Sequence, residues 1–339
     1  MNSEMIQTSR INMAVRRAGT AGAPKLMLVH GNLSSSVFYE DLMELLADDF
    51  DMVAPDLRSF GDTQALPIDA TRGLRDHSDD LYALAQTLGW ESFGLLGWSM
   101  GGGAVMQFAI DHPEMLTGLI LEAPLAPFGF AGTTDERGTI LEPVGIGCGG
   151  GSVNPMVVEA LNNKERELFK TVLKNSYVKP PFTFDSETED KLVDGILKTK
   201  TGEGFYPGNA IPCEQWPGFK AGDAGVCNTL SPEYCDLSAI AEMPTNIPVL
   251  WIRGDSDVVV ADGSNADLAT LGQLGIVPGY PGADVYPAQP MLAQTRYVLE
   301  QFAARGGNYR EVVYENSGHG SHLEFPERFA DDLRNLLLT

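Results

Sequence analysis

The strongest constraint on the fold is the segment 97–101, Gly-Trp-Ser-Met-Gly, which lies between an expected strand and an expected helix. The apolar residues 93–96 are typical of a buried strand, and residues 102–108 are typical of the start of a helix. Glycines two places before and two places after Ser99 relieve the crowding of a sharp strand-to-helix turn. Such a turn would lift the Ser99 hydroxyl clear of the sheet and direct the helix N-terminus at negative charge forming beside it.

Further motifs lie where strands of the same sheet are expected to end. His30-Gly31 follows the apolar run 25–29, and residues 56–62 (DLRSFGD) follow the next expected strand. Downstream, residues 251–257 (WIRGDSD) follow an apolar pair, and residues 318–327 (GHGSHLEFPE) lie near the C-terminus. Nucleophile, acid and histidine would therefore follow one another in this order along the chain.

With these motifs the chain resembles the α/β-hydrolase superfamily, in its serine hydrolase branch with a lid or cap insertion. The resemblance covers about 10–123 and 245–339 and implies an α/β fold, a mostly parallel sheet with helices on both faces. The alternation of apolar strands with amphipathic helices independently favours a mostly parallel sheet covered on both faces. The expected strands are 25–29, 50–54, 93–96, 118–121, 247–252 and 309–314.

Residues 124–243 break this alternation of strands and helices. They contain loops rich in glycine and proline and three helical candidates, at 156–161, 165–174 and 187–198. The resemblance implies that this segment is a cap over the strand ends, inserted between two parts of the hydrolase core, 1–123 and 244–339. A second insertion, 261–289, is also expected to border the pocket.

A catalytic serine needs a base within hydrogen-bond reach, because its hydroxyl is a poor nucleophile at neutral pH. The resemblance places this base at His319, with His322 as its competitor. An acid must then hold the imidazole in the right tautomer. The resemblance favours Asp257 as this acid, and Glu122 and Asp255 remain as alternatives.

The oxyanion that forms during acyl transfer needs hydrogen-bond donors that already point at it. The backbone N–H of Met100 is one expected donor, because Met100 follows the nucleophile directly. The second donor is expected from the loop after His30, either the Asn32 N–H or that of Leu33. Both roles belong to the backbone.

The composition of the chain limits the kinds of partner that it is expected to bind. A net charge of −23 argues against nucleic acid, whose phosphates need a basic surface. No apolar run reaches the ~18 residues that span a bilayer, which argues against a membrane protein, and the first residues lack a signal-like pattern. We therefore expect a cytoplasmic protein. The four cysteines, without nearby histidines, argue against a metal site and indicate free thiols, or disulfides if the protein is exported: Cys148, Cys213, Cys227 and Cys235.

The function these features favour is hydrolysis of a small-molecule carboxylic ester or lactone through an acyl-enzyme, without cofactor or metal. Acyltransferase, perhydrolase, amidase and carbon–carbon hydrolase activities use the same triad and stay open as alternatives. A ligand receptor that keeps a hydrolase-like pocket is the non-enzymatic alternative. The sequence does not indicate the oligomeric state.

Overall fold

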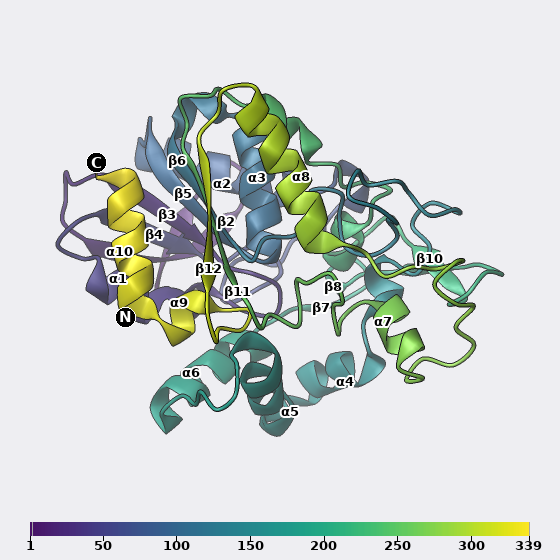
Figure 1. The fold of residues 1–339 in the computed structure, drawn as a ribbon. Helices are drawn as coiled ribbons and strands as arrows, with labels where there is room; N and C mark the ends of the chain where they lie inside the picture. Colours follow the sequence, from purple (N-terminus) through teal and green to yellow (C-terminus); the bar gives the residue numbers. More distant parts are fainter. Residues whose placement is uncertain (2, 339) are drawn as a thin grey trace.

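The main sheet lies in the left and central part of Figure 1, with residues of the middle of the chain below it and to its right. The computed structural model describes residues 1 and 3–338. Eight strands lie in the order β1-β2-β4-β3-β5-β6-β11-β12. Their bounds are β1 (Ser3–Gln7), β2 (Asn12–Gly19), β3 (Lys25–Val29), β4 (Asp51–Pro55), β5 (Phe93–Trp98), β6 (Leu116–Glu122), β11 (Val249–Gly254) and β12 (Tyr309–Tyr314). The strands from β4 to β12 are mutually parallel, and β1 and β2 add an antiparallel edge. The expected mostly parallel sheet is confirmed.

Helices cover both faces of this sheet (Figure 1). Helices α2 and α3 pack on each other, with α3 against β5 and β6, whereas α1 and α10 pack together on the other face. The helices of the core are α1 (Glu40–Leu45), α2 (Arg75–Leu88), α3 (Met100–Asp111), α8 (Met291–Ala304), α9 (Ser321–Glu324) and α10 (Pro326–Leu337). The short 3-10 helices are η1 (Ser36–Tyr39), η2 (Ala70–Arg72), η3 (Pro113–Met115), η4 (Gly149–Ser152), η6 (Cys227–Leu230) and η7 (Ser238–Glu242).

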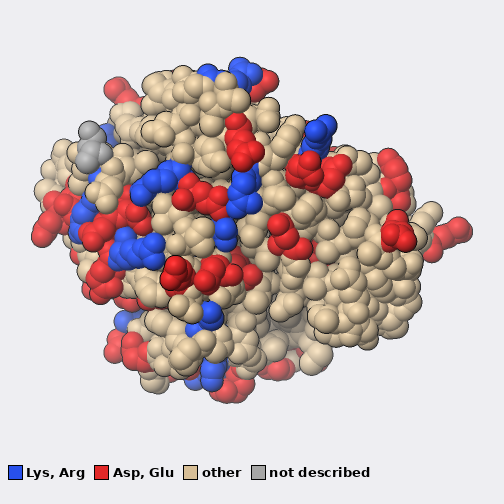
Figure 2. Space-filling view, in the orientation of Figure 1, with Lys and Arg blue, Asp and Glu red and all other residues tan. Residues whose placement is uncertain are grey.

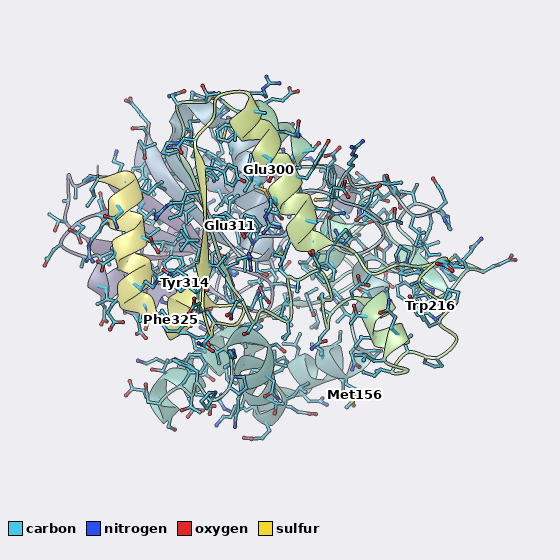
Figure 3. The ribbon with its side chains drawn as sticks, in the orientation of Figure 1. Met156, Trp216, Glu300, Glu311, Tyr314 and Phe325 are labelled. Atoms are coloured by element: carbon cyan, nitrogen blue, oxygen red, sulfur yellow. The ribbon has the colours of Figure 1, made fainter. Side chains whose placement is uncertain are left out.

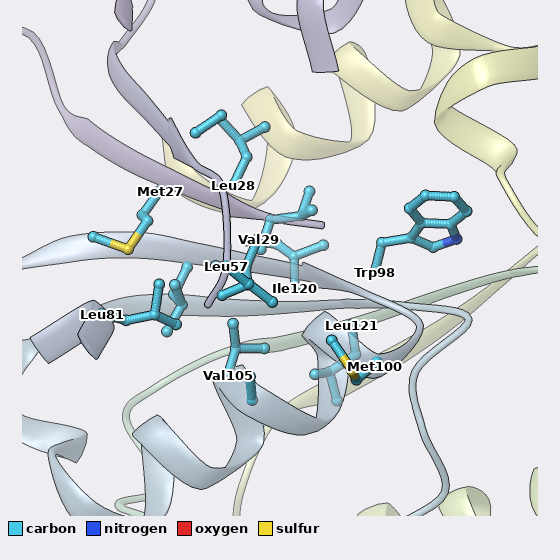
Figure 4. Packing of buried hydrophobic residues seen from close by; sticks show 14 of the residues in the cluster. Met27, Leu28, Val29, Leu57, Leu81, Trp98, Met100, Val105, Ile120 and Leu121 are labelled. Atoms are coloured by element: carbon cyan, nitrogen blue, oxygen red, sulfur yellow. The ribbon is translucent and has the colours of Figure 1, made fainter. Parts of the chain in front are cut away.

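The core lies between the sheet and these helices. Figure 4 shows aliphatic side chains of β3 and β6 meeting those of α2 and α3, among them Leu81, Val105 and Leu121. All three are fully buried. Continuous apolar strands of this kind suit a parallel sheet that is covered on both faces. Strand β5 and helix α3 both pack in this core, and the turn between them carries Ser99.

Residues 124–243, here called the middle segment, leave the sheet after β6 and return at β11, the strand that pairs with β6. The expected helices occur there as α4 (Pro155–Asn163), α5 (Arg166–Val172) and α6 (Ser186–Leu197), and α5 continues into the π-helix η5 (Leu173–Tyr177). Its short strands are β7 (Thr201–Gly202), β8 (Tyr206–Pro207), β9 (Ala210–Pro212) and β10 (Phe219–Ala221). Helix α7 (Leu268–Gln273) lies in the second insertion.

Charged side chains are spread over the face seen in Figure 2, where acidic groups are interspersed with lysines and arginines. The surface over α7, at the right of this view, is largely free of charge. Among the helices of residues 1 and 3–338, none is long and apolar enough to cross a membrane.

His77 in helix α2 is fully buried, and neither of its ring nitrogens has a hydrogen-bond partner among the described residues. Burial, followed by the nearby Arg58 charge, lowers the pKa of His77 to about 3. In the unfolded chain the pKa of a histidine is about 6.5, so protons bind the unfolded chain preferentially below that pH. His77 therefore does not lower the free energy of unfolding above about pH 6.5. Below that pH, its preference for the uncharged form reduces this free energy progressively as the pH falls toward 3.

We expect His77 to account for about 2 kcal/mol of the loss in unfolding free energy between about pH 7.5 and pH 5. Urea unfolding of the wild type and of His77→Leu at both pH values measures this, because leucine has a similar volume and does not titrate. The variant should show a weaker pH dependence by that amount. An unchanged pH dependence in His77→Leu would contradict the assignment.

Candidate active site

Ser99 occupies a strained turn between β5 and α3. Its φ is +58°, in the left-handed region that non-glycine residues rarely adopt. The flanking glycines are required by close approach: a Cβ on Gly97 would lie 2.4 Å from the Gly101 carbonyl oxygen, and one on Gly101 would lie 2.3 Å from that of Val29. The Ser99 N–H donates to the Glu122 carbonyl oxygen at 3.0 Å, which ties the turn to the end of β6. The expected turn is therefore present, with Ser99 at its apex.

Asp257 and His319 are in direct contact although 62 residues separate them. Nδ1 of His319 lies 2.8 Å from Asp257 Oδ2, and both side chains are buried. The other oxygen, Oδ1, accepts the backbone N–H groups of Val259 at 2.7 Å and Val260 at 3.1 Å. These bonds hold the carboxylate in one orientation. Because Oδ2 can only accept a hydrogen bond, the proton of the neutral imidazole lies on Nδ1. Nε2 is then left as the acceptor, the tautomer that a general base for serine needs.

The other expected candidates for acid and base pair with each other. His322 Nδ1 lies 2.8 Å from Glu122 Oε2, and the His322 N–H donates to Glu122 Oε1 at 2.9 Å. Both residues are fully or almost fully buried, and neither is among the residues that line the cavity beside Ser99. Asp255, the remaining alternative, is exposed and accepts the Ser256 hydroxyl. Among the three carboxylates, only Asp257 contacts His319 in the described residues.

Trp98 separates the two histidines. Its indole N–H donates to the His319 carbonyl oxygen at 2.9 Å. The ring centroid lies 5.4 Å from that of His319 and 5.1 Å from that of His322. Figure 4 shows this side chain on the side of the sheet toward the C-terminal segments. The indole therefore contacts both histidine rings and is hydrogen-bonded to the backbone of the His319 loop.

The loop after His30 approaches the nucleophile closely. A Cβ on Gly31 would lie 2.8 Å from the Ser99 Cβ. Leu33 donates its N–H to the Asn32 side-chain Oδ1 at 3.0 Å, so this donor is already engaged. The Asn32 N–H has no acceptor among the described residues, and Met100 is the first residue of α3, where N–H groups lack an i−4 partner. Of the two donors expected from this loop, the structure leaves Asn32 available.

His30 itself supports the loop from within. Its Nε2 accepts the Leu57 N–H at 2.9 Å, and its Nδ1 faces the Gly31 carbonyl oxygen at 2.8 Å. Burial lowers the pKa of His30 to about 4. The ring is therefore neutral near pH 7, with its proton on Nδ1, and it links the loop to the end of β4.

Tyr177, the last residue of η5, is a contact that sequence reasoning missed. Its hydroxyl lies 2.9 Å from the carbonyl oxygens of both Asn32 and Leu33 and shares its one proton between these two acceptors. Its own carbonyl oxygen accepts the Gly320 N–H at 2.7 Å, beside His319. Burial raises the pKa of the Tyr177 hydroxyl, which keeps it a donor. One residue of the middle segment thus joins the Asn32 loop to the His319 loop, and nothing in the local sequence signals a contact across 144 residues.

These residues open into a cavity of about 530 Å³. Its walls come from the strand ends, the middle segment and the second insertion: Asn32, Leu33, Ser99, Met100, Leu125, Phe130, Gly149, Ser152, Val153, Asn154, Val157, Val172, Ser176, Tyr177, Tyr206, Cys227, Leu230, Val259, Val260, Asn265, Ala266, Leu271 and His319. This volume lies within the usual range for small-molecule sites. Residues 1 and 3–338 contain no cluster of three or more His, Cys, Asp and Glu side chains that could hold a metal ion, and all four cysteines are free thiols.

A family model described as the alpha/beta hydrolase fold matches residues 24–140, which include the Asn32 loop and the Ser99 turn. This part of the chain is similar to α/β hydrolases, and the chain has the α/β-hydrolase fold. Among curated proteins, an uncharacterized hydrolase of Saccharomyces cerevisiae is 32% identical over 107 residues, 32% of this chain and 37% of that protein. The 2-(acetamidomethylene)succinate hydrolase of Mesorhizobium japonicum is 23% identical over 84% of this chain and 88% of its own length.

Solved structures with the same fold align over the whole chain or nearly so. The esterase RhEst1 from Rhodococcus sp. ECU1013 aligns over 100% of this chain and 99% of its own, with a TM-score of 0.64 and 16% identity. The enol-lactonase from Burkholderia xenovorans LB400 aligns over 99% and 100%, with a TM-score of 0.62 and 14% identity. At these identities the structural matches establish the fold.

Proposed function

We propose that this α/β-hydrolase-fold protein is a serine hydrolase that cleaves carboxylic esters or lactones through an acyl-enzyme. The observation that carries the proposal is the 2.8 Å contact between His319 Nδ1 and Asp257 Oδ2, beside a cavity that His319 and Ser99 both line. Nucleophile, base and orienting carboxylate are the minimal set for such chemistry. The esterase and lactonase among the structural neighbours are compatible with the proposal.

In the proposed mechanism Ser99 Oγ attacks the substrate carbonyl carbon and His319 Nε2 takes the hydroxyl proton. The oxyanion accepts the N–H groups of Met100 and Asn32 while the tetrahedral intermediate exists. His319 then gives its proton to the leaving alcohol, and the C–O bond to that alcohol breaks. Water, deprotonated by His319, then attacks the acyl carbon. The bond from that carbon to Ser99 Oγ breaks, His319 returns the proton to Oγ, and the acid is released. Asp257 stabilises the imidazolium in both steps.

The same proposal assigns the middle segment a role. Residues 124–243 would act as a cap over a core formed by 1–123 and 244–339. The support is that Val157, Ser176 and Tyr177 of this segment line the same cavity as Ser99 and His319. A cap in this position sets the size and polarity of the substrate, because it supplies much of the cavity wall.

The test is covalent labelling with a fluorophosphonate. Ser99 Oγ would bond to phosphorus with loss of fluoride, and intact mass measures one adduct per chain. We expect a single adduct on the wild type, located by peptide mapping at Ser99, and none on Ser99→Ala. Absence of labelling on the folded wild type, or labelling of another residue, would overturn the proposal.

Tyr177→Phe should lower kcat about tenfold and leave KM nearly unchanged. The variant keeps the ring but loses the hydrogen bonds that fix the Asn32 and Leu33 carbonyl groups, so the oxyanion donor is less well oriented; one such bond contributes about 0.5–1.5 kcal/mol. Steady-state kinetics on a p-nitrophenyl ester measure this.

The matched control is Tyr206→Phe. Tyr206 lines the same cavity, but its hydroxyl has no hydrogen-bond partner among the described residues. Its loss should change kcat less than about twofold, since no hydrogen bond breaks. Equal effects of the two variants, or a change confined to KM in Tyr177→Phe, would show that Tyr177 does not position the oxyanion loop.

A further inference from the structure

Side chains with a formal charge are missing from the wall of the cavity. None of its lining residues is Lys, Arg, Asp or Glu. The titratable groups besides His319 are Tyr177, Tyr206 and Cys227. Burial raises the pKa of all three, that of the Cys227 thiol to about 12. Near neutral pH the walls therefore offer a substrate hydroxyls, amides and aliphatic groups, with His319 in the role proposed above.

Two of the segments that line the cavity carry no cation at all. These segments, 138–163 and 254–295, contain neither lysine nor arginine. A third segment, 164–177, contains four cations, but none of them is among the residues that line the cavity. Each of the first two segments contributes two valines to the wall, Val153 and Val157 from the first and Val259 and Val260 from the second. The surface over α7, in the second segment, is largely uncharged in Figure 2. A carboxylate that entered this cavity would meet no counter-ion.

Burial of an anion under these conditions is unfavourable. An ionised carboxylate that leaves water without a cationic partner loses much more hydration free energy than amides and hydroxyls return. Burial of an uncharged acyl chain is favourable, because its apolar surface moves from water into contact with the aliphatic side chains of the wall. The residues of the wall therefore favour an uncharged acyl group over one that carries a carboxylate.

We propose that the site takes uncharged, largely apolar acyl groups or lactones and rejects substrates that carry a carboxylate in the part held by this cavity. This rests on the proposed function and adds its substrate class. It separates the chain from the relative whose name specifies a succinate derivative, although the two align over most of their lengths. The net charge of −23 also repels anions, but that effect acts through solvent and is screened by salt.

The experiment compares three p-nitrophenyl esters of equal chain length: the hexanoate, the half-ester of adipic acid, and the ω-carboxamide of that half-ester. The carboxamide matches the carboxylate in size and polarity but is neutral. We expect kcat/KM for the carboxylate to be at least about 100-fold below that for the hexanoate, and the carboxamide to fall within about tenfold of it. The measurements are made in about 1 M NaCl, where the Debye length is about 3 Å.

A pair of variants then tests whether the wall is the cause. Val157→Lys places a cation in the cavity, and Met156→Lys adds the same charge to the exposed side of α4, where Met156 is 66% exposed (Figure 3). Val157→Lys should raise kcat/KM for the carboxylate ester about tenfold, and Met156→Lys should leave it unchanged. Circular dichroism and retained fluorophosphonate labelling establish that each variant is folded.

The outcomes distinguish the two levels of proposal. If none of the three esters is hydrolysed and no fluorophosphonate adduct forms, the proposed function fails. If the carboxylate and hexanoate esters react at similar rates in high salt, the function stands and the substrate class is overturned. The substrate class is also overturned if kcat/KM for the carboxylate ester rises no more in folded Val157→Lys than in Met156→Lys.

Discussion

Ser99→Ala should lower kcat for ester hydrolysis by about 10⁵–10⁶-fold, to a rate set by the oxyanion donors and binding alone. The change removes one oxygen atom that makes no hydrogen bond among the described residues, and it keeps the Cβ in the same strained backbone conformation. The melting temperature should therefore change little. Stopped assays at high enzyme concentration, together with thermal unfolding, measure both quantities.

Ser176→Ala is the control for this variant, because Ser176 lines the same cavity and its hydroxyl also lacks a hydrogen-bond partner. It should retain kcat within about threefold. If Ser99→Ala keeps more than a few per cent of the wild-type rate, another residue is the nucleophile. A large loss in both variants would instead indicate that the cavity is sensitive to any change of serine.

Asp257→Asn should lower kcat about 10⁴-fold, for a reason that the hydrogen bonds of the carboxylate make specific. Oδ1 accepts two backbone N–H groups, from Val259 and Val260, so an amide would keep its carbonyl oxygen there. Its NH₂ group would then face His319 Nδ1 in place of Oδ2. The ring would have to accept at Nδ1 and carry its proton on Nε2, which is the wrong tautomer for removing the Ser99 proton.

Glu122→Gln is the matched control, because it makes the same chemical change in the other histidine–carboxylate pair. We expect a loss of less than about tenfold in kcat, since Glu122 contacts His322 and the cavity is lined by neither. The unfolding free energy should fall, because a buried histidine loses its charged partner. A kcat loss in Glu122→Gln that exceeds the loss in Asp257→Asn would transfer the role of the acid to Glu122.

Local patterns in the sequence predict the parts of the molecule in which a short segment carries its own signal. The turn around Ser99 was such a case, because two glycines and the flanking apolar runs lie within a few residues of one another. The parallel strands were predicted for the same reason, and the helices of the middle segment occur within a few residues of their expected bounds. Strand β1 gave no signal, because four of its five residues are exposed at the sheet edge and show no alternation.

Other elements escaped prediction because their pattern is weak or their partner is distant. Helix α8 was not expected at all, since it follows directly on a loop rich in glycine and proline. Its Arg296 and Arg253 of β11 both donate to Glu311 of β12, so this contact joins three separate segments. The hydrophobic periodicity of a single segment cannot predict a contact between three segments.

The sequence by itself determined the superfamily resemblance, the order of the strands along the chain and the identity of the candidate nucleophile, because these depend on residues close together. Tertiary structure alone decided which histidine meets which carboxylate: Asp257 with His319, and Glu122 with His322. It also decided that Tyr177 reaches the Asn32 loop and that the cavity wall is free of charge. The physical reason is that hydrogen bonds and desolvation depend on distances of a few ångströms between segments, and such distances exist only after the sheet has brought the segments together.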